Sequence, residues 1–299
     1  MKTVQQTVEE KYTNSDGNLH AYPLDQNSQY LSESIGLYMQ YLVLVEDEKN
    51  FEIQVDRLVS DYLVEQNELV FVRWVLYEDA TVNALIDDVR IIASLNEASE
   101  LFNQPAYEKL SSRLEETISR VQQSDGIHVD FYDWTFRMPA ERITLSYLIN
   151  DYSATNKTKQ LLISLDDTAV FFPEYYDVKY QKYIESKEVH LIDQLLIAIN
   201  RQDMGHGSST FENWVTREWK SNGKLLGRYD RQTQEATVNY ESLAVYYYLS
   251  LYFNKINEPA FAKEVMEQAE KIATAKTLAD THFFDYIQYQ MLLEKNTKK

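Results

Sequence analysis

Helical periodicity is the feature of this sequence that most restricts its fold. Apolar residues recur at intervals of three and four through most of the chain, with short polar loops between the periodic segments. The predicted helices cover residues 32–47, 51–65, 84–98, 104–122, 141–150, 157–165, 186–202, 209–220, 240–256, 258–274 and 280–295. Glycine (7) and proline (5) are too scarce for the many turns that an all-β protein of 299 residues needs.

The predicted helices are of two kinds. Some are apolar on nearly every face, as helices buried on two sides must be: 32–47, 84–98, 186–202 and 240–256. Others have one charged face, as outer helices do: 51–65, 104–122 and 258–274. Inner helices alternating with outer ones predict an all-α fold, an (α/α)6 barrel whose inner ring is wrapped by an outer ring.

The periodic pattern also suggests how the chain is divided. Residues 1–29 are polar and show no sustained period, so we expect an N-terminal arm followed by a single domain over 30–299. Two stretches interrupt the helices: 126–139, with alternating bulky residues, and 225–237, which predicts a hairpin with a polar turn. In a helical barrel such excursions shape the rim of the cleft.

The charge and composition of the chain exclude some classes of binding partner. The 47 acidic residues exceed the 29 basic ones, and a net charge of -18 repels nucleic acid and acidic polymers. A neutral or cationic polysaccharide is compatible with this charge. The chain has no cysteine, and its five histidines lack metal-ligand spacing, so we expect no metal and no cofactor. We expect a monomer.

No apolar signal region stands at the amino terminus, and no run of 18 apolar residues occurs. The chain as given is expected to be soluble. We expect an extracellular or surface-tethered protein, and its signal or anchor is then expected upstream of the given sequence.

Two motifs carry the candidate chemistry. Tyr30-Leu-Ser-Glu-Ser-Ile-Gly-Leu-Tyr-Met-Gln-Tyr41 places Glu33 in the first turn of an apolar helix, with Ser32 as the expected N-cap. Ala84-Leu-Ile-Asp-Asp-Val-Arg-Ile-Ile-Ala-Ser-Leu95 again brings acidic residues to a helix start. A glutamate in a first turn has an ordinary role too, because it complements the helix dipole.

In their order and spacing, these motifs resemble the Ser-Glu-x-x-Gly-Tyr and Ala-x-Asp-x-Asp-x-x-Ile-Ala motifs of family 8 glycoside hydrolases. The resemblance also implies the (α/α)6 barrel and hydrolysis with inversion, which uses two carboxyl groups about 6.5–9.5 Å apart. It implies that Glu33 is the general acid and that Asp88 holds the sugar. Ile86 occupies the first acidic position of the second motif, and Asp87 is interpreted as a solvated neighbour or a helix cap.

The general base has two candidates, because the family's Tyr-Asp-Ala-x-Arg string does not occur. Asp193 lies in the fourth predicted inner helix, where the family carries its base, and interrupts an apolar run. Glu241 has a more similar local sequence but falls on the fifth inner helix, and capping explains it equally well. Topology favours Asp193 as the base and leaves Glu241 as a substrate contact.

Aromatic and basic residues in or near the interruptions are candidate platforms for sugar rings. They are Trp74, Tyr132, Trp134, Arg137, Tyr176, Arg228 and Tyr229. For each of them alone, packing in the protein is the commoner role.

The sequence thus predicts an endo-acting inverting hydrolase of a β-linked bacterial polysaccharide. Within family 8 it resembles the divergent members associated with exopolysaccharide synthesis, which implies the synthase machinery as a further partner. The alternative is a catalytically inactive barrel that binds polysaccharide or a synthase subunit, with Glu33 retained as a cap.

Overall fold

The computed structural model describes residues 2–148 and 155–297, and most of them are helical. Contacts within the chain define two compact units. The first unit comprises Met1–Ser124, His128–Ala140 and Leu278–Lys299, so both ends of the chain contribute to it. The second unit comprises Asp125–Ile127 and Glu141–Thr277. The expected single domain over 30–299 stays a prediction.

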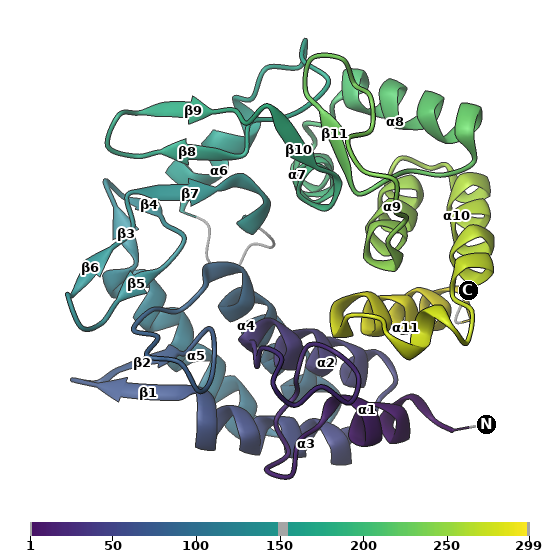
Figure 1. Ribbon diagram of the computed structural model, residues 1–299. Helices are drawn as coiled ribbons and strands as arrows, with labels where there is room; N and C mark the ends of the chain where they lie inside the picture. Colours follow the sequence, from purple (N-terminus) through teal and green to yellow (C-terminus); the bar gives the residue numbers. More distant parts are fainter. Residues whose placement is uncertain (1, 149–154, 298–299) are drawn as a thin grey trace. The chain divides into compact units, whose positions relative to one another are not determined.

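Figure 1 labels the elements of the first unit. Its helices are α1 (Val4–Tyr12), α2 (Ser32–Leu44), α3 (Glu48–Arg57), α4 (Leu85–Leu101), α5 (Pro105–Val121) and α11 (Phe283–Thr297), with the π-helical turn η1 (Leu58–Tyr62) after α3. Its strands are β1 (Leu63–Gln66), β2 (Leu69–Val72), β3 (Gln123–Ser124), β5 (Tyr132–Asp133) and β6 (Met138–Pro139). The elements β4 (Ile127–His128) and η3 (Thr277–Ala279) span the borders between the units.

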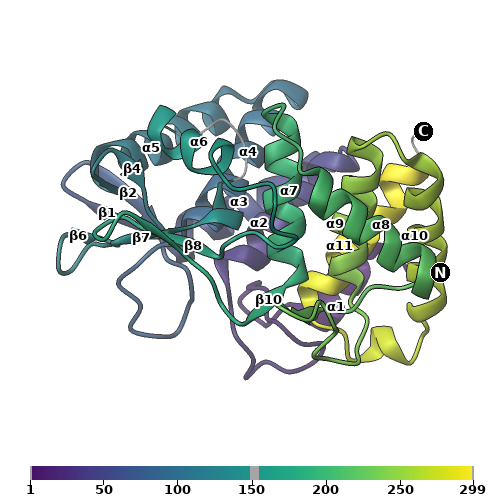
Figure 2. The same ribbon diagram turned by 90° about the horizontal axis from the view of Figure 1, so that it is seen from above.

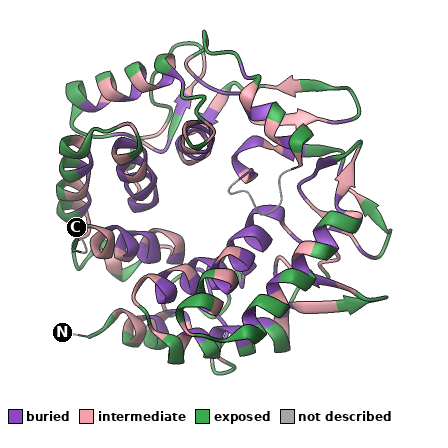
Figure 3. Ribbon diagram, turned by 180° about the vertical axis from the view of Figure 1, so that it is seen from behind, coloured by how far each residue is buried: buried purple, intermediate pink, exposed green. Residues whose placement is uncertain are grey.

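Helix α2 is the centre of the first unit, because α3, α4 and α11 all pack against it. Figure 3 shows it buried along most of its length. Helix α5 packs on α4 and exposes its charged face. The apolar and amphipathic sequence patterns therefore correspond to an inner and an outer helix in this unit.

Gly36 permits the close contact between α2 and α4. A Cβ atom on Gly36 would lie 3.3 Å from Cγ1 of Ile91 and 3.7 Å from Cβ of Arg90. The absence of a side chain therefore lets the two helices approach where Arg90 faces α2.

The first residues of the chain fold onto this unit. A capping box at Thr3 begins α1. At the end of α1, the ring of Tyr12 lies 5.2 Å from that of Phe283 and 5.3 Å from that of Tyr286, between ring centroids. The expected polar arm over residues 1–29 thus includes a helix, because Val8 and Tyr12 give it a buried face.

Two antiparallel hairpins complete the first unit. Strands β1 and β2 pair from Leu63↔Val72 to Gln66↔Leu69, and β5 pairs with β6. The rings of Phe71 and Tyr132 stack at 5.4 Å.

The second unit contains the remaining elements. Its helices are α6 (Asn156–Ile163), α7 (Leu191–Asp203), α8 (Ser209–Asn222), α9 (Leu243–Lys255) and α10 (Pro259–Ile272), with a 3-10 turn η2 (Leu145–Tyr147). Its strands are β7 (Arg142–Thr144), β8 (Tyr175–Asp177), β9 (Lys182–Ile184), β10 (Glu188–His190) and β11 (Arg228–Asp230). Helix α9 packs between α7 and α10 (Figures 1 and 2).

Strands replace predicted helix in the second unit. The predicted helix 141–150 is wrong where the structure describes it, because β7 and η2 occupy residues 142–147; positions 149–150 lie outside the described residues. Buried Ile143 and Leu145 alternate with polar neighbours, which is a strand period. The predicted helix 186–202 begins only at Leu191, since β10 pairs with β11. The predicted hairpin over 225–237 is present in shorter form: Tyr229 bridges Ala236, the Asp230 N–H donates to the Glu235 carbonyl, and the Thr237 N–H donates to the Arg228 carbonyl.

We predict that Gly36→Leu destabilises the protein by about 1–3 kcal/mol, because the new side chain must enter space already filled by α4. Urea denaturation measures the loss. The matched control is Ala260→Leu, which enlarges an exposed alanine of α10 and should change stability by less than about 0.5 kcal/mol. Equal stability of the two variants would show that α2 and α4 are not closely packed at Gly36.

Candidate active site

Glu33 lies in the first turn of α2, as predicted. The preceding segment is held by a hydrogen bond from the Ser32 backbone N–H to the carbonyl of Trp74, at 2.9 Å. The Glu33 side chain is 29% exposed, so its carboxylate is reachable by a ligand. Oε1 accepts a hydrogen bond of 2.6 Å from Nη1 of Arg90 on α4.

Ser32 has a different role from the predicted one. The N-cap position is Leu31, which makes no side-chain cap, and Ser32 is the first helical residue. Its hydroxyl donates to Oδ2 of Asp87 at 2.7 Å. The expected N-cap therefore links α2 to α4 through their first turns.

Asp87 joins Glu33 and Arg90 in one charged cluster. Nη1 of Arg90, whose side chain is 4% exposed, lies 3.6 Å from Oδ1 of Asp87 as well as 2.6 Å from Glu33. Burial, and then the negative charge of Glu33, raise the pKa of Asp87 to about 7, against the opposing effects of Arg90 and Ser32. One cation thus serves two carboxyl groups, and Asp87 is the one that retains a proton near neutral pH.

The sequence interpretation of Asp87 as a solvated neighbour or cap is wrong, since the residue is buried. A usable signal was present, because Asp87 and Arg90 stand three positions apart on one helix and can form an ion pair. The sequence did not show that Glu33 shares that arginine.

Asp88 faces a different set of partners. It is buried, and Oδ2 accepts a hydrogen bond from the side-chain amide of Asn83. Asn83 in turn bonds to Gln122 and accepts from the backbone N–H of Tyr132 at 2.8 Å. Burial holds the pKa of Asp88 well above its usual range. These contacts fix the segment that leads into β5, and a sugar contact by Asp88 stays a prediction.

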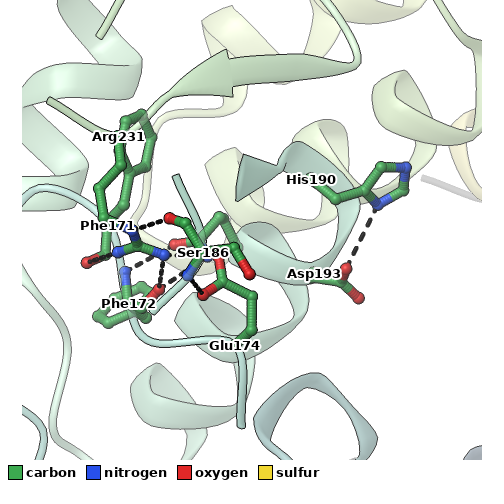
Figure 4. A network of polar contacts seen from close by, with 8 residues as sticks. Phe171, Phe172, Glu174, Ser186, His190, Asp193 and Arg231 are labelled. Carbon is green, nitrogen blue, oxygen red and sulfur yellow. Dashed lines mark hydrogen bonds and ion pairs between the residues drawn. The ribbon is translucent and has the colours of Figure 1, made fainter. Parts of the chain in front are cut away.

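Asp193 lies in the first turn of α7, in the second unit. Oδ1 accepts a hydrogen bond of 2.7 Å from the Ser146 hydroxyl, and Oδ2 lies 3.4 Å from Nδ1 of His190. Figure 4 shows the His190 ring directed at this carboxylate. The Asp193 side chain is 36% exposed, so it combines fixed partners with access to solvent.

A hydrogen-bonded network holds the backbone near α7. The guanidinium of Arg231 donates to the carbonyls of Ser186, Phe171 and Phe172 and pairs with Glu174 (Figure 4). Buried Gln194, next to Asp193, exchanges two hydrogen bonds with the backbone of Phe172. The start of α7 is therefore fixed from two sides.

Glu241 precedes α9, and its interpretation as a helix cap is wrong. The cap is Ser242, whose side chain accepts from the backbone N–H of Val245. Oε2 of Glu241 instead accepts hydrogen bonds from the Tyr246 hydroxyl and from Nε2 of Gln268. Glu241 thus links α9 to α10.

The predicted sugar platforms divide by exposure. In the first unit Tyr132 and Trp134 are buried against Phe71, Trp74 is half-buried and Arg137 is exposed.

In the second unit Tyr229 is buried against Trp214, and Tyr176 packs on Tyr183 at 5.1 Å. Arg228 is exposed and pairs with Glu188 at 2.8 Å. Packing accounts for the buried rings, as expected for each of them alone.

Two further classes of site were sought over residues 2–148 and 155–297. That part of the chain contains no group of three or more His, Cys, Asp or Glu side chains placed to hold a metal ion. None of its helices combines the length and the hydropathy that crossing a bilayer requires.

Comparison with known proteins places this chain among relatives. No protein-family model matches it. Over 246 residues, 78% of this chain and 67% of the relative, it is 32% identical to the "Putative lipoprotein YdaJ" of Bacillus subtilis (strain 168). It is 36% identical to PssZ from Listeria monocytogenes, whose crystal structure matches with a TM-score of 0.91 over 99% of this chain and 96% of PssZ.

More distant structures share the fold alone. A novel alpha-amylase from Clostridium perfringens is 18% identical, with a TM-score of 0.83 over 97% of this chain and 96% of that one. Endoglucanase Cel10 of Klebsiella pneumoniae, a family 8 glycosyl hydrolase, is 12% identical, with a TM-score of 0.69 over the whole of both chains. The chain therefore belongs to the family of YdaJ and PssZ, which has a divergent form of the family 8 glycoside hydrolase fold.

Proposed function

We propose that this protein is an endo-acting glycoside hydrolase that cleaves a β-linked bacterial exopolysaccharide with inversion. Glu33 is the general acid, Asp193 is the general base, and the helices close into an (α/α)6 barrel. The observation that carries the proposal is the cluster of Glu33, Asp87 and Arg90, in a chain with the fold of family 8 hydrolases. It offers a reachable carboxylate beside a buried carboxyl that retains a proton.

The cluster suggests how a proton reaches the leaving oxygen. Near neutral pH, Asp87 holds a proton while Arg90 hydrogen-bonds to Glu33. A sugar covering Glu33 removes water from it, which disfavours its charged form. Glu33 then takes up the proton that Asp87 releases, Asp87 is left as the anion beside Arg90, and Glu33 donates the proton to the glycosidic oxygen.

The supporting roles follow the same chemistry. Asp193 activates the attacking water, with Ser146 and His190 orienting its carboxylate. Exposed Arg137 and half-buried Trp74 and Tyr176 remain candidate sugar contacts.

The proposed setting is outside the cell. The name of YdaJ as a lipoprotein supports an extracellular or surface-tethered protein, with a neutral or cationic polysaccharide as ligand. Exopolysaccharide synthase machinery is a further proposed partner, and the protein is proposed to act as a monomer.

An inactive polysaccharide-binding protein is the second candidate. Two observations favour it: the family's Tyr-Asp-Ala-x-Arg string is absent, and Glu33 already has a structural partner in the buried Arg90. Reducing-end assays on barley β-glucan, chitosan, soluble starch and crude exopolysaccharide separate the two candidates. Starch is included because the alpha-amylase shares the fold, and cleavage of starch alone would overturn the β-linkage.

We predict that Glu33→Gln lowers turnover by at least about a hundredfold, because glutamine keeps the hydrogen bond from Arg90 but supplies no proton. Substrate binding should change little, and so should thermal unfolding, because loss of the negative charge of Glu33 lowers the pKa of Asp87 and lets Asp87 pair with Arg90 as an anion. The matched control is Glu48→Gln, which alters the first-turn glutamate of α3 and should leave turnover unchanged. Near-full activity of Glu33→Gln would remove Glu33 from the mechanism.

Asp193→Asn and Glu241→Gln, made separately, test the choice of base. We expect Asp193→Asn to abolish turnover with binding retained. Glu241→Gln should cause only partial loss, through the contacts between α9 and α10. An active Asp193→Asn with an inactive Glu241→Gln would reverse the assignment, and release of the retained anomer by wild type would contradict inversion.

The raised pKa of Asp87 predicts a pH-dependent stability difference. Above the unfolded-state pKa of about 3.9, the native state binds the proton more tightly, so wild type loses stability as pH rises toward about 7. Asp87→Asn carries no such proton. Urea denaturation at pH 5 and 8 should show the variant gaining about 1–3 kcal/mol relative to wild type.

The control for that measurement is Asp56→Asn, at an exposed position of α3, whose difference from wild type should not change across the same pH range. A pH-independent difference for Asp87→Asn would show that Asp87 does not take up a proton in this range.

A further inference from the structure

A polar pocket of about 650 Å³ lies in the first unit, apart from the cluster around Glu33. We name it the arm pocket, after the N-terminal segment that forms one wall. Its principal residues are Asp16, Asn18, Arg57, Asp61, Arg73 and Tyr77. Its volume is within the range of about 300–1,000 Å³ that small-molecule sites occupy.

The N-terminal segment forms the first wall and packs closely against Arg57. Oδ1 of Asn14 accepts the backbone N–H groups of Asp16 and Asn18, which fixes the turn after α1. Gly17 in this turn has φ +89°, and a Cβ there would lie 2.6 Å from the guanidinium of Arg57. The positive φ favours glycine here, and the Arg57 guanidinium lies directly against the turn.

The second wall is the end of α3 and the π-helical turn η1. Arg57 and Asp61, four positions apart in this wall, form an ion pair with 4.0 Å between Nη1 and Oδ2. Short π-helical segments are uncommon and occur frequently at functional sites.

Two buried polar atoms of the pocket residues lack partners among the residues that the structure describes. They are Nε of Arg73 and Oδ1 of Asn18, a residue only 3% exposed. Arg73 also forms no ion pair within residues 2–148 and 155–297. Both atoms are shielded from solvent, so a ligand meets them only when the side chain turns toward the pocket, and that turn gives a hydrogen bond to a buried group that otherwise has none.

Tyr77 supplies the third wall. It has φ +61°, which is strained for an aromatic residue, yet its ring is 65% exposed. Its hydroxyl accepts a hydrogen bond from Nδ2 of Asn18 at 3.1 Å, and its ring meets that of Tyr30 edge-on at 4.9 Å. These two contacts fix the orientation of the ring while most of the residue stays exposed, and an exposed ring on a strained backbone points to a binding role.

The charges select the class of ligand. Four carboxylates line the pocket, those of Asp16, Asp61, Glu78 and Asp79, against two guanidiniums. The carboxylates disfavour a phosphate or a uronic acid, and the guanidiniums disfavour a simple cation. Closely spaced donors and acceptors beside an exposed ring fit the hydroxyl groups and the apolar face of a pyranose.

We propose that the arm pocket binds a pyranose unit of a polysaccharide, as a second binding site apart from the scissile bond. The proposal rests on the proposed function, because it takes the polymer that Glu33 cleaves as its ligand. Leu76 donates to the carbonyl of Tyr30, and Leu31 bridges Val75, so the loop carrying Tyr77 runs beside the segment leading into Glu33. The two sites therefore lie on adjoining segments of the first unit.

Affinity electrophoresis of the full chain in gels containing barley β-glucan, soluble starch or chitosan tests the proposal. Glu33→Gln is the background, so that the polymer is bound without being cleaved. Adding Arg73→Ala should weaken binding by about tenfold, the effect of losing a charged hydrogen bond. The control is Arg120→Ala, at an exposed arginine of α5, which should leave binding unchanged.

Tyr77→Asn distinguishes binding from a structural role. Asparagine tolerates positive φ better than tyrosine, so the melting temperature should be unchanged or higher. Binding should nevertheless weaken, because the ring is lost. A residue that only supported the loop would lower the melting temperature and binding together.

The outcomes separate this proposal from the proposed function. Polymer binding by the Glu33→Gln background that neither Arg73→Ala nor Tyr77→Asn weakens overturns the arm pocket alone. Binding that both substitutions weaken, with no hydrolysis by wild type, supports the arm pocket and overturns the hydrolase. Failure to bind any of the polymers overturns the arm pocket, and the reducing-end assay then judges the hydrolase.

Discussion

The arrangement of the first unit depends on one buried cation. Arg90 is removed from water and contacted by two carboxyl groups, Glu33 on α2 and Asp87 on its own helix. A buried guanidinium is unfavourable unless it is paired, so its partners must be held in place. Gly36 permits the close approach of the helices, and Ser32 orients Asp87. The same contacts that satisfy Arg90 thus hold a carboxylate at the surface of the helix pair.

Helical periodicity predicted the helices well where burial alone determines which positions of the helix are apolar. Segments 32–47, 84–98 and 104–122 correspond to α2, α4 and α5 within a few residues. It failed at 141–150, where a run rich in apolar residues satisfies both a helical and a strand period, and pairing with β8 decides between them. It also missed α1, whose buried face is defined by partners near the far end of the sequence.

The candidate site was predictable to the extent that it depends on helix starts. Glu33 and Asp193 both lie in first turns, as the sequence indicated. The sequence interpretation assigned Asp87 a solvated or capping role and so missed its contact with Arg90, because adjacent residues on a helix point to different neighbours and only the tertiary contacts identify them. The strain at Tyr77 was equally hidden, since nothing in the local sequence marks positive φ for a tyrosine.

The composition of the first unit from both ends of the chain bears on how the protein is made. Helix α11 packs on α2, and Phe283 contacts Tyr12, yet the ribosome synthesises the whole of the second unit before α11. During translation, the apolar surface of α2 that α11 later covers is therefore exposed to solvent while the second unit emerges from the ribosome. Folding of the first unit is completed only after α11 has left the ribosome, so chaperone binding in that interval would protect the α2 surface from aggregation.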